Sequence, residues 1–137
     1  FPWTKLISIN GFPRFVDGDG FPEGVPASTV EAMIAGMERN SSRVVRDFLA
    51  LCGGGGVPDD LNPDRLRGGL DWLLGWDARA VLKDEKVHVL AGRNDPIMPA
   101  AMTEHGFAGH PIHWHDGGHL LPLTHPKWCA DKIRECL

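Results

Sequence analysis

The sequence of 137 residues contains no tyrosine, only three cysteines, no long apolar run and no excess of positive charge. The odd cysteine count, without metal-ligand spacing, favours reduced thiols and a cytoplasmic protein. No apolar run approaches the roughly 20 residues that a membrane span needs, so no membrane partner is expected. The formal net charge of −4 likewise gives no reason to expect a nucleic-acid partner.

What the sequence does contain is a series of short apolar segments separated by helical patterns. Residues 5–10, 86–91 and 111–115 are short runs bounded by glycine or proline, which predicts three strands. A capping box at Ser28 and Glu31 predicts the start of the first helix. Strands that alternate with helices predict an α/β fold with about three parallel strands.

The chain divides into three parts. Residues 1–15 are expected to hold a core strand and its exit loop, and residues 77–137 the C-terminal core. Residues 16–76 contain helical patterns, with helices expected from 28, from 43 and from 63, but no strand. A helical insertion between strands is typical of a cap or lid.

Two expected strands end beside residues that can do chemistry. Asp95 follows the strand at 86–91, and His119 follows the strand at 111–115 after two glycines. Ligand sites in open α/β sheets lie at the carboxyl ends of the strands. If the two strands are neighbours, the carboxylate and the imidazole lie side by side.

The pattern Gly-x-x-Asp-x-x-x-Pro at 92–99, followed by Gly-Gly-His at 117–119 and His-Pro at 125–126, resembles the C-terminal half of the α/β-hydrolase fold. The stretches 43–51 and 66–77 are similar to the lid of one branch, the pimeloyl-[acyl carrier protein] methyl ester esterases of biotin synthesis. The resemblance implies a serine-type carboxylesterase with no cofactor and no metal ion. In it, His119 is the general base and Asp95 orients the imidazole.

The family carries its nucleophilic serine in a Gly-x-Ser-x-Gly turn, which this sequence lacks. The four serines lie inside an expected strand or at expected helix starts: Ser8, Ser28, Ser41 and Ser42. We therefore expect the nucleophile to belong to a missing N-terminal half and the isolated chain to be inactive. That half, or a second copy of the chain, is expected to cover the open edge of the strand at 5–10.

The same resemblance predicts substrate and partner contacts. Phe48, Ile97 and Leu120 are candidates for the wall of a substrate pocket, and each also suits the core. The expected substrate is an ester, either a small molecule or bound to a carrier protein. The positive charges on one lid helix fit either a solvated face or an acidic carrier: Arg39, Arg43 and Arg46.

Two other functions remain open. One is a non-catalytic binding domain that has kept the fold. The other is a zinc-dependent hydrolase that uses His113, His115 and His119. Alternate residues of a strand face the same side, and imidazole is a common zinc ligand. His88, within a strand, is expected to be a packed or edge histidine.

Overall fold

The structure is a computed structural model that describes residues 5–83 and 85–137. Two compact units make up the chain: a sheet unit of residues 1–13 and 78–137, and a helical unit of residues 14–77. The boundaries of the helical unit lie one or two residues from those expected for the lid.

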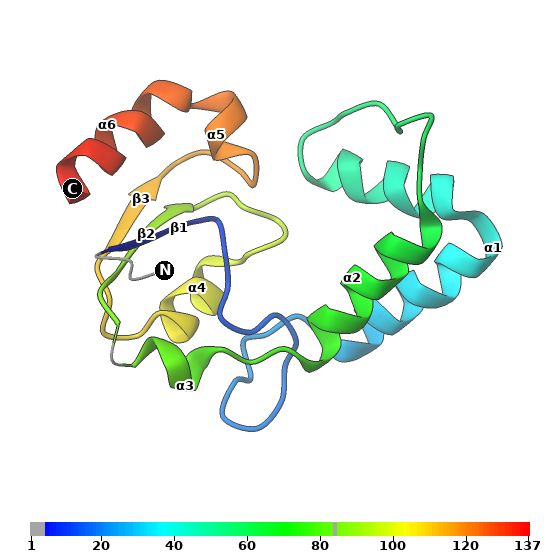
Figure 1. Ribbon diagram of the computed structural model, residues 1–137, viewed down its shortest axis with the longest axis horizontal. Coiled ribbons are helices and arrows are strands. Elements are labelled where there is room, and N and C mark those ends of the chain that lie inside the picture. The colour runs from blue at the N-terminus through cyan, green and yellow to red at the C-terminus, as the bar shows by residue number, and fades with distance from the viewer. Residues whose placement is uncertain (1–4, 84) are drawn as a thin grey trace. The chain divides into compact units, whose positions relative to one another are not determined.

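Three strands of the sheet unit form one parallel sheet, in the order β1 (Leu6–Ile9), β2 (Val87–Gly92) and β3 (Ile112–His115) (Figure 1). All three segments predicted as strands are strands, so the α/β fold class is confirmed. Because β2 is central, the ends of β2 and β3 that precede Asp95 and His119 are direct neighbours.

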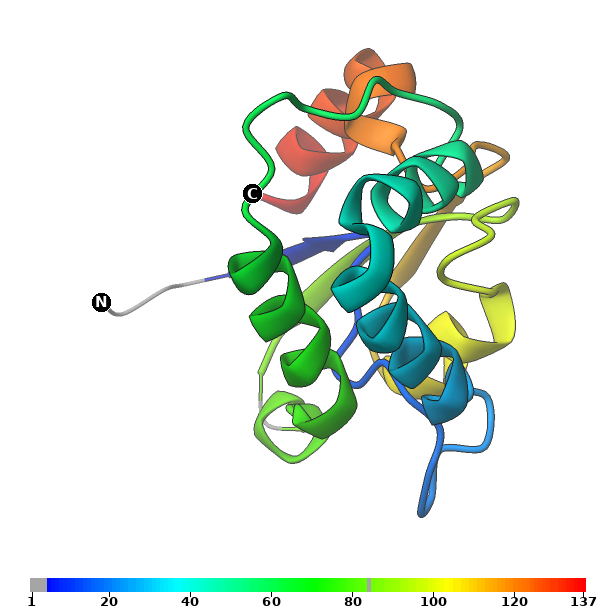
Figure 2. The same cartoon turned by 90° about the vertical axis from the view of Figure 1, so that its right-hand side faces the viewer.

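Side chains on the two faces of the sheet pack into two separate cores. Figure 2 shows α4 (Ala100–Gly106) and α6 (Pro126–Cys136) on opposite sides of the strands. The core on the α4 side contains Val87, Val89, Ala91 and Phe107. The core on the α6 side contains Leu90, Leu121 and Cys129. The alternation along β2 follows from the two-residue period of a strand, which sends successive side chains to opposite faces.

Two helices of this unit are so short that no sequence pattern predicts them. The helix α3 (Arg79–Leu82) precedes β2, and α5 (Leu121–Thr124) lies between the His119 loop and α6. Each spans a single turn, too short for an apolar period to show in the sequence.

The helical unit contains α1 (Ala27–Leu51) and α2 (Pro63–Gly75), which lie side by side in both ribbon views (Figures 1 and 2). Asn40 interrupts α1 with φ −162° and ψ 86°. The Asn40 side-chain oxygen accepts a hydrogen bond from the backbone N–H of Arg43 at 2.9 Å. The two predicted helices are therefore the two halves of α1, and Asn40 caps the second half.

The prediction that Ser28 caps the first helix is wrong. The helix begins at Ala27, so Ser28 lies inside the first turn, and the N-cap residue Pro26 makes no side-chain cap. Asp17 accepts the hydrogen bond of the Ala27 N–H at 3.0 Å instead. A carboxylate from the preceding loop thus replaces the local capping box. Among the described residues, no helix is long and apolar enough to cross a membrane.

Candidate active site

Asp95 and His119 are in contact at the carboxyl end of the sheet. The Nδ1 atom of His119 lies 2.8 Å from Oδ2 of Asp95. The Asp95 side chain is 1% exposed, whereas that of His119 is 21% exposed. The acid is therefore enclosed, and the imidazole bridges between it and the surface.

The loop after β2 fixes the orientation of the carboxylate. Oδ1 of Asp95 accepts hydrogen bonds from the backbone N–H groups of Ile97 and Met98, at 2.8 and 2.9 Å. An aspartate that bonds the backbone two and three residues ahead stabilises a turn. Because one oxygen is held by this turn, the other stays directed at His119.

Asp95 also determines which nitrogen of His119 can act as a base. In a neutral imidazole one ring nitrogen donates and the other accepts. With Nδ1–H directed at the carboxylate, Nε2 carries the lone pair. Within the described residues, no hydrogen bond is made to this nitrogen, so it can accept a proton from another group.

The loops that carry the two residues approach each other so closely that glycine is required. A Cβ atom on Gly92 would lie 2.5 Å from the carbonyl oxygen of Gly117. That oxygen accepts a hydrogen bond from the backbone of Asn94 at 3.2 Å, and the Gly117 N–H donates to Nδ1 of His115 at 2.9 Å. The glycines therefore bring the acid loop and the histidine loop into direct backbone contact.

Asn10 is a positioning residue that the sequence analysis missed. It follows β1, is 8% exposed and adopts a left-handed φ of 46°. Its Oδ1 accepts from the Gly92 N–H at 2.9 Å, and its Nδ2 donates to the carbonyl oxygens of Gly118, at 3.0 Å, and His119. One side chain thus joins the ends of all three strands. The only local sign of this role is an asparagine between a strand and Gly11.

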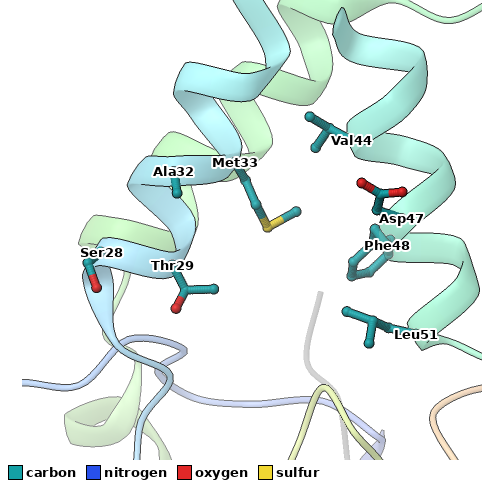
Figure 3. Close-up of a pocket in the computed structure, with 8 residues that line it drawn as sticks. All are labelled: Ser28, Thr29, Ala32, Met33, Val44, Asp47, Phe48 and Leu51. Carbon is teal, nitrogen blue, oxygen red and sulfur yellow. The ribbon is translucent and has the colours of Figure 1, made fainter.

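The predicted pocket residues lie in both units. Ile97 and Leu120 are half-buried near Asp95 and His119 in the chain, and Ile97 contributes the backbone N–H described above. Phe48 lines a hollow of about 550 Å³ between the two halves of α1. Figure 3 shows Met33 pointing from the first half toward Val44 and Phe48 of the second.

The hollow has apolar walls with a few polar groups. Its other lining residues are Ser28, Thr29, Ala32, Val44, Asp47 and Leu51. Met33 and Phe48 also border a smaller apolar space toward α2. A hollow of this size and polarity suits an aliphatic chain.

The three arginines of α1 are exposed. Arg43 lies 3.7 Å from Asp47, so its charge is partly balanced, and Arg39 donates to the carbonyl of Ala35 at 3.2 Å. A further pair joins Arg67 of α2 to Glu38 of α1, and this contact raises the pKa of Arg67.

The structure does not assemble the predicted zinc set of His113, His115 and His119. Alternate residues of a strand are about 7 Å apart, and His119 is engaged by Asp95. His115 packs its ring against His125 and Trp128, with centroids 4.1 and 4.9 Å away. Among the described residues, the group that could hold a metal ion is instead His88, His113 and Cys136.

Comparison with solved structures identifies the fold. An esterase from Exiguobacterium antarcticum matches 96% of this chain with a TM-score of 0.79 and 20% identity. A hydrolase from Pseudomonas aeruginosa matches 94% of it with a TM-score of 0.73 and 20% identity. The chain has the α/β fold of these two structures.

The match is to part of each neighbour. It covers 56% of the esterase and 53% of the hydrolase, so this chain spans just over half of their length. No protein-family model and no curated protein matches the sequence.

Proposed function

We propose that this chain supplies the acid and the general base of a serine-type carboxylic-ester hydrolase. The observation that carries the proposal is the 2.8 Å contact between the enclosed Asp95 carboxylate and the partly exposed His119 imidazole. The same two residues carry the resemblance to the α/β-hydrolase family. The fold shared with an esterase and a hydrolase is consistent with it.

The proposed mechanism gives each atom of the pair a role. Nε2 of His119 takes the proton from a serine hydroxyl, whose oxygen attacks the ester carbonyl carbon. Asp95 stabilises the resulting imidazolium through Nδ1. The imidazolium then gives its proton to the leaving alkoxide, which leaves an acyl-enzyme. A water molecule, deprotonated by the same nitrogen, releases the acid and the serine.

The serine would come from a part of the protein outside these 137 residues. Ser8 lies within β1, and the other three serines lie in α1 of the helical unit. Within the described residues, β1 pairs with β2 alone, and Leu6 of β1 is 38% exposed. We propose that the part carrying the serine adds a strand to this edge of the sheet.

The favoured substrate is an acyl methyl ester carried by an acidic protein, as in the pimeloyl-[acyl carrier protein] esterases that the sequence resembles. The hollow at Met33 and Phe48 is proposed to hold the acyl chain. Arg39, Arg43 and Arg46 lie exposed on the same helix and are proposed to contact the acidic carrier.

The primary test is reaction of the whole native protein with a fluorophosphonate, followed by denaturing mass spectrometry of every polypeptide present. We expect one labelled serine outside residues 1–137, and loss of the label when His119 is replaced by glutamine. His110→Gln, which changes a histidine of the loop before β3, is the matched control and should label normally. A label on this chain itself, or no label on the whole protein, would refute the proposal.

The substrate is tested separately with esters of different acyl length. Phe48→Ala should lower kcat/KM for a long acyl methyl ester about tenfold and leave an acetyl ester almost unchanged. Replacing Arg39, Arg43 and Arg46 by glutamate should raise KM for the carrier-bound ester only. Arg65→Glu, on α2, is the charge control. Equal effects on long, short and carrier-bound esters would contradict these assignments while leaving the catalytic pair intact.

A further inference from the structure

Three metal-binding side chains gather at the end of the sheet opposite to Asp95. His88 is the second residue of β2, His113 the second of β3, and Cys136 the last of α6. One ligand atom from each lies within 4.8 Å of the other two. His113 is in register with Leu90, and His88 precedes Leu90 by two residues, so both histidines lie before the strand ends that lead to Asp95 and His119.

The two histidines are placed by the sheet itself. They lie on neighbouring strands with their rings nearly parallel, 5.9 Å between centroids and 17° between planes. Nδ1 of His88 is buried and has no hydrogen-bond partner among the described residues. Buried polar atoms are almost always paired, because an unpaired one loses its bond to water without replacement. The position therefore calls for a partner that the described residues do not provide.

Cys136 supplies the third ligand atom, close to one of the two histidines. Its side chain is buried, and Sγ lies 3.8 Å from Nε2 of His113. Zinc bonds of about 2.3 Å to sulfur and about 2.0 Å to nitrogen put these two tetrahedral ligand atoms about 3.5 Å apart. Sulfur and nitrogen are thus within a few tenths of an ångström of ligand geometry.

The end of α6 is held in place by a separate contact. Nζ of Lys5 donates to the carbonyl oxygen of Cys136 at 2.6 Å and also to that of Leu137. A cation at the carboxyl end of a helix offsets the partial negative charge there. Lys5, which directly precedes β1, therefore ties the end of α6 to the start of the sheet independently of any ion.

We propose that His88, His113 and Cys136 form a zinc site. Imidazole and thiolate are the ligands that zinc prefers, and three protein ligands leave a fourth position for water. Both histidines are partly exposed, which gives the ion a route from solvent. Cys136 loses its proton on binding, and the ion fastens the end of α6 to the starts of β2 and β3. The site has no part in the proposed ester hydrolysis.

The test is titration of the full chain with Co²⁺ in the absence of oxygen, followed by addition of Zn²⁺. We expect a sulfur-to-cobalt charge-transfer band in the near ultraviolet and tetrahedral bands in the visible, both complete at one equivalent. Zinc should abolish both. A spectrum equal to that of cobalt in buffer would overturn the proposal.

Variants locate the site. Cys136→Ser should remove the charge-transfer band, and His113→Gln should weaken cobalt binding at least about tenfold. The matched control is Cys129→Ala, which removes a buried thiol from the same helix and should keep the full spectrum. Retention of the band in Cys136→Ser would overturn the assignment. Should that variant fail to fold, unchanged affinity in folded His113→Gln would do the same.

Discussion

Replacement of Asn10 by alanine tests how the sheet unit holds the candidate site. The change removes three side-chain hydrogen bonds, to Gly92, Gly118 and His119. At about 1 kcal/mol each, their loss costs about 3 kcal/mol. The φ of 46° adds about 1 kcal/mol, because alanine does not tolerate the left-handed region as asparagine does.

We therefore expect Asn10→Ala to lower the free energy of unfolding by about 4 kcal/mol. That is a large share of the roughly 5–15 kcal/mol by which domains are stable. Urea unfolding followed by circular dichroism measures it. Asn62→Ala is the matched control: Asn62 makes one exposed cap bond, to Arg65 at the start of α2, and its loss should cost about 1 kcal/mol.

The variant Asn10→Asp separates the contribution of the side-chain hydrogen bonds from that of the left-handed backbone conformation. Aspartate keeps the acceptor for Gly92 and tolerates the left-handed φ, but it turns an oxygen toward two carbonyl oxygens. We expect Asn10→Asp to lower the free energy of unfolding by clearly more than Asn62→Ala does. If Asn10→Ala costs no more than Asn62→Ala, or Asn10→Asp is neutral, Asn10 does not join the strand ends as described.

Three further predictions concern single residues of the sheet unit. Asp95→Asn in the whole protein should lower kcat for ester hydrolysis on the order of 10⁴-fold with little change in KM; a loss below tenfold would remove the acid from the mechanism. Gly92→Ala should destabilise the chain and slow fluorophosphonate labelling, because its Cβ would lie 2.5 Å from the Gly117 carbonyl oxygen; Gly56→Ala, with nothing within 4 Å, should do neither. Burial raises the pKa of the Cys129 thiol, so the folded chain binds this proton more tightly than the unfolded chain. The protonated Cys129 thiol should thus stabilise the fold at neutral pH, and this stabilisation should be lost as the pH rises above the ordinary thiol pKa. The urea midpoint should therefore fall over that pH range, and it should fall less in Cys129→Ala.

The sequence alone determined the three strands, the longer helices and one long-range pair. Short apolar runs bounded by glycine and proline identified β1, β2 and β3, since local sterics and turn chemistry act over a few residues. The helix expected from residue 63 is α2, which begins at Pro63, a residue that favours the first position of a helix. Asp95 and His119 could be predicted as neighbours because each follows a strand, and parallel strands end at one edge.

Tertiary structure decided the contacts between segments that carry no shared local pattern. Asp17 replaces the Ser28 capping box because a loop folds back onto Ala27, which no three-residue spacing encodes. Asn10 reaches Gly118 and His119 across 108 and 109 residues.

The histidines show the same difference between what the sequence predicts and what the tertiary structure decides. Alternation along β3 suggested a zinc set of His113, His115 and His119, but strand register places His113 beside β2, near His88. The ring of His115 packs on α6, and Cys136 reaches the pair from the end of that helix. Periodicity gives the face on which a side chain lies; only packing of strand against strand and helix against sheet determines its neighbours.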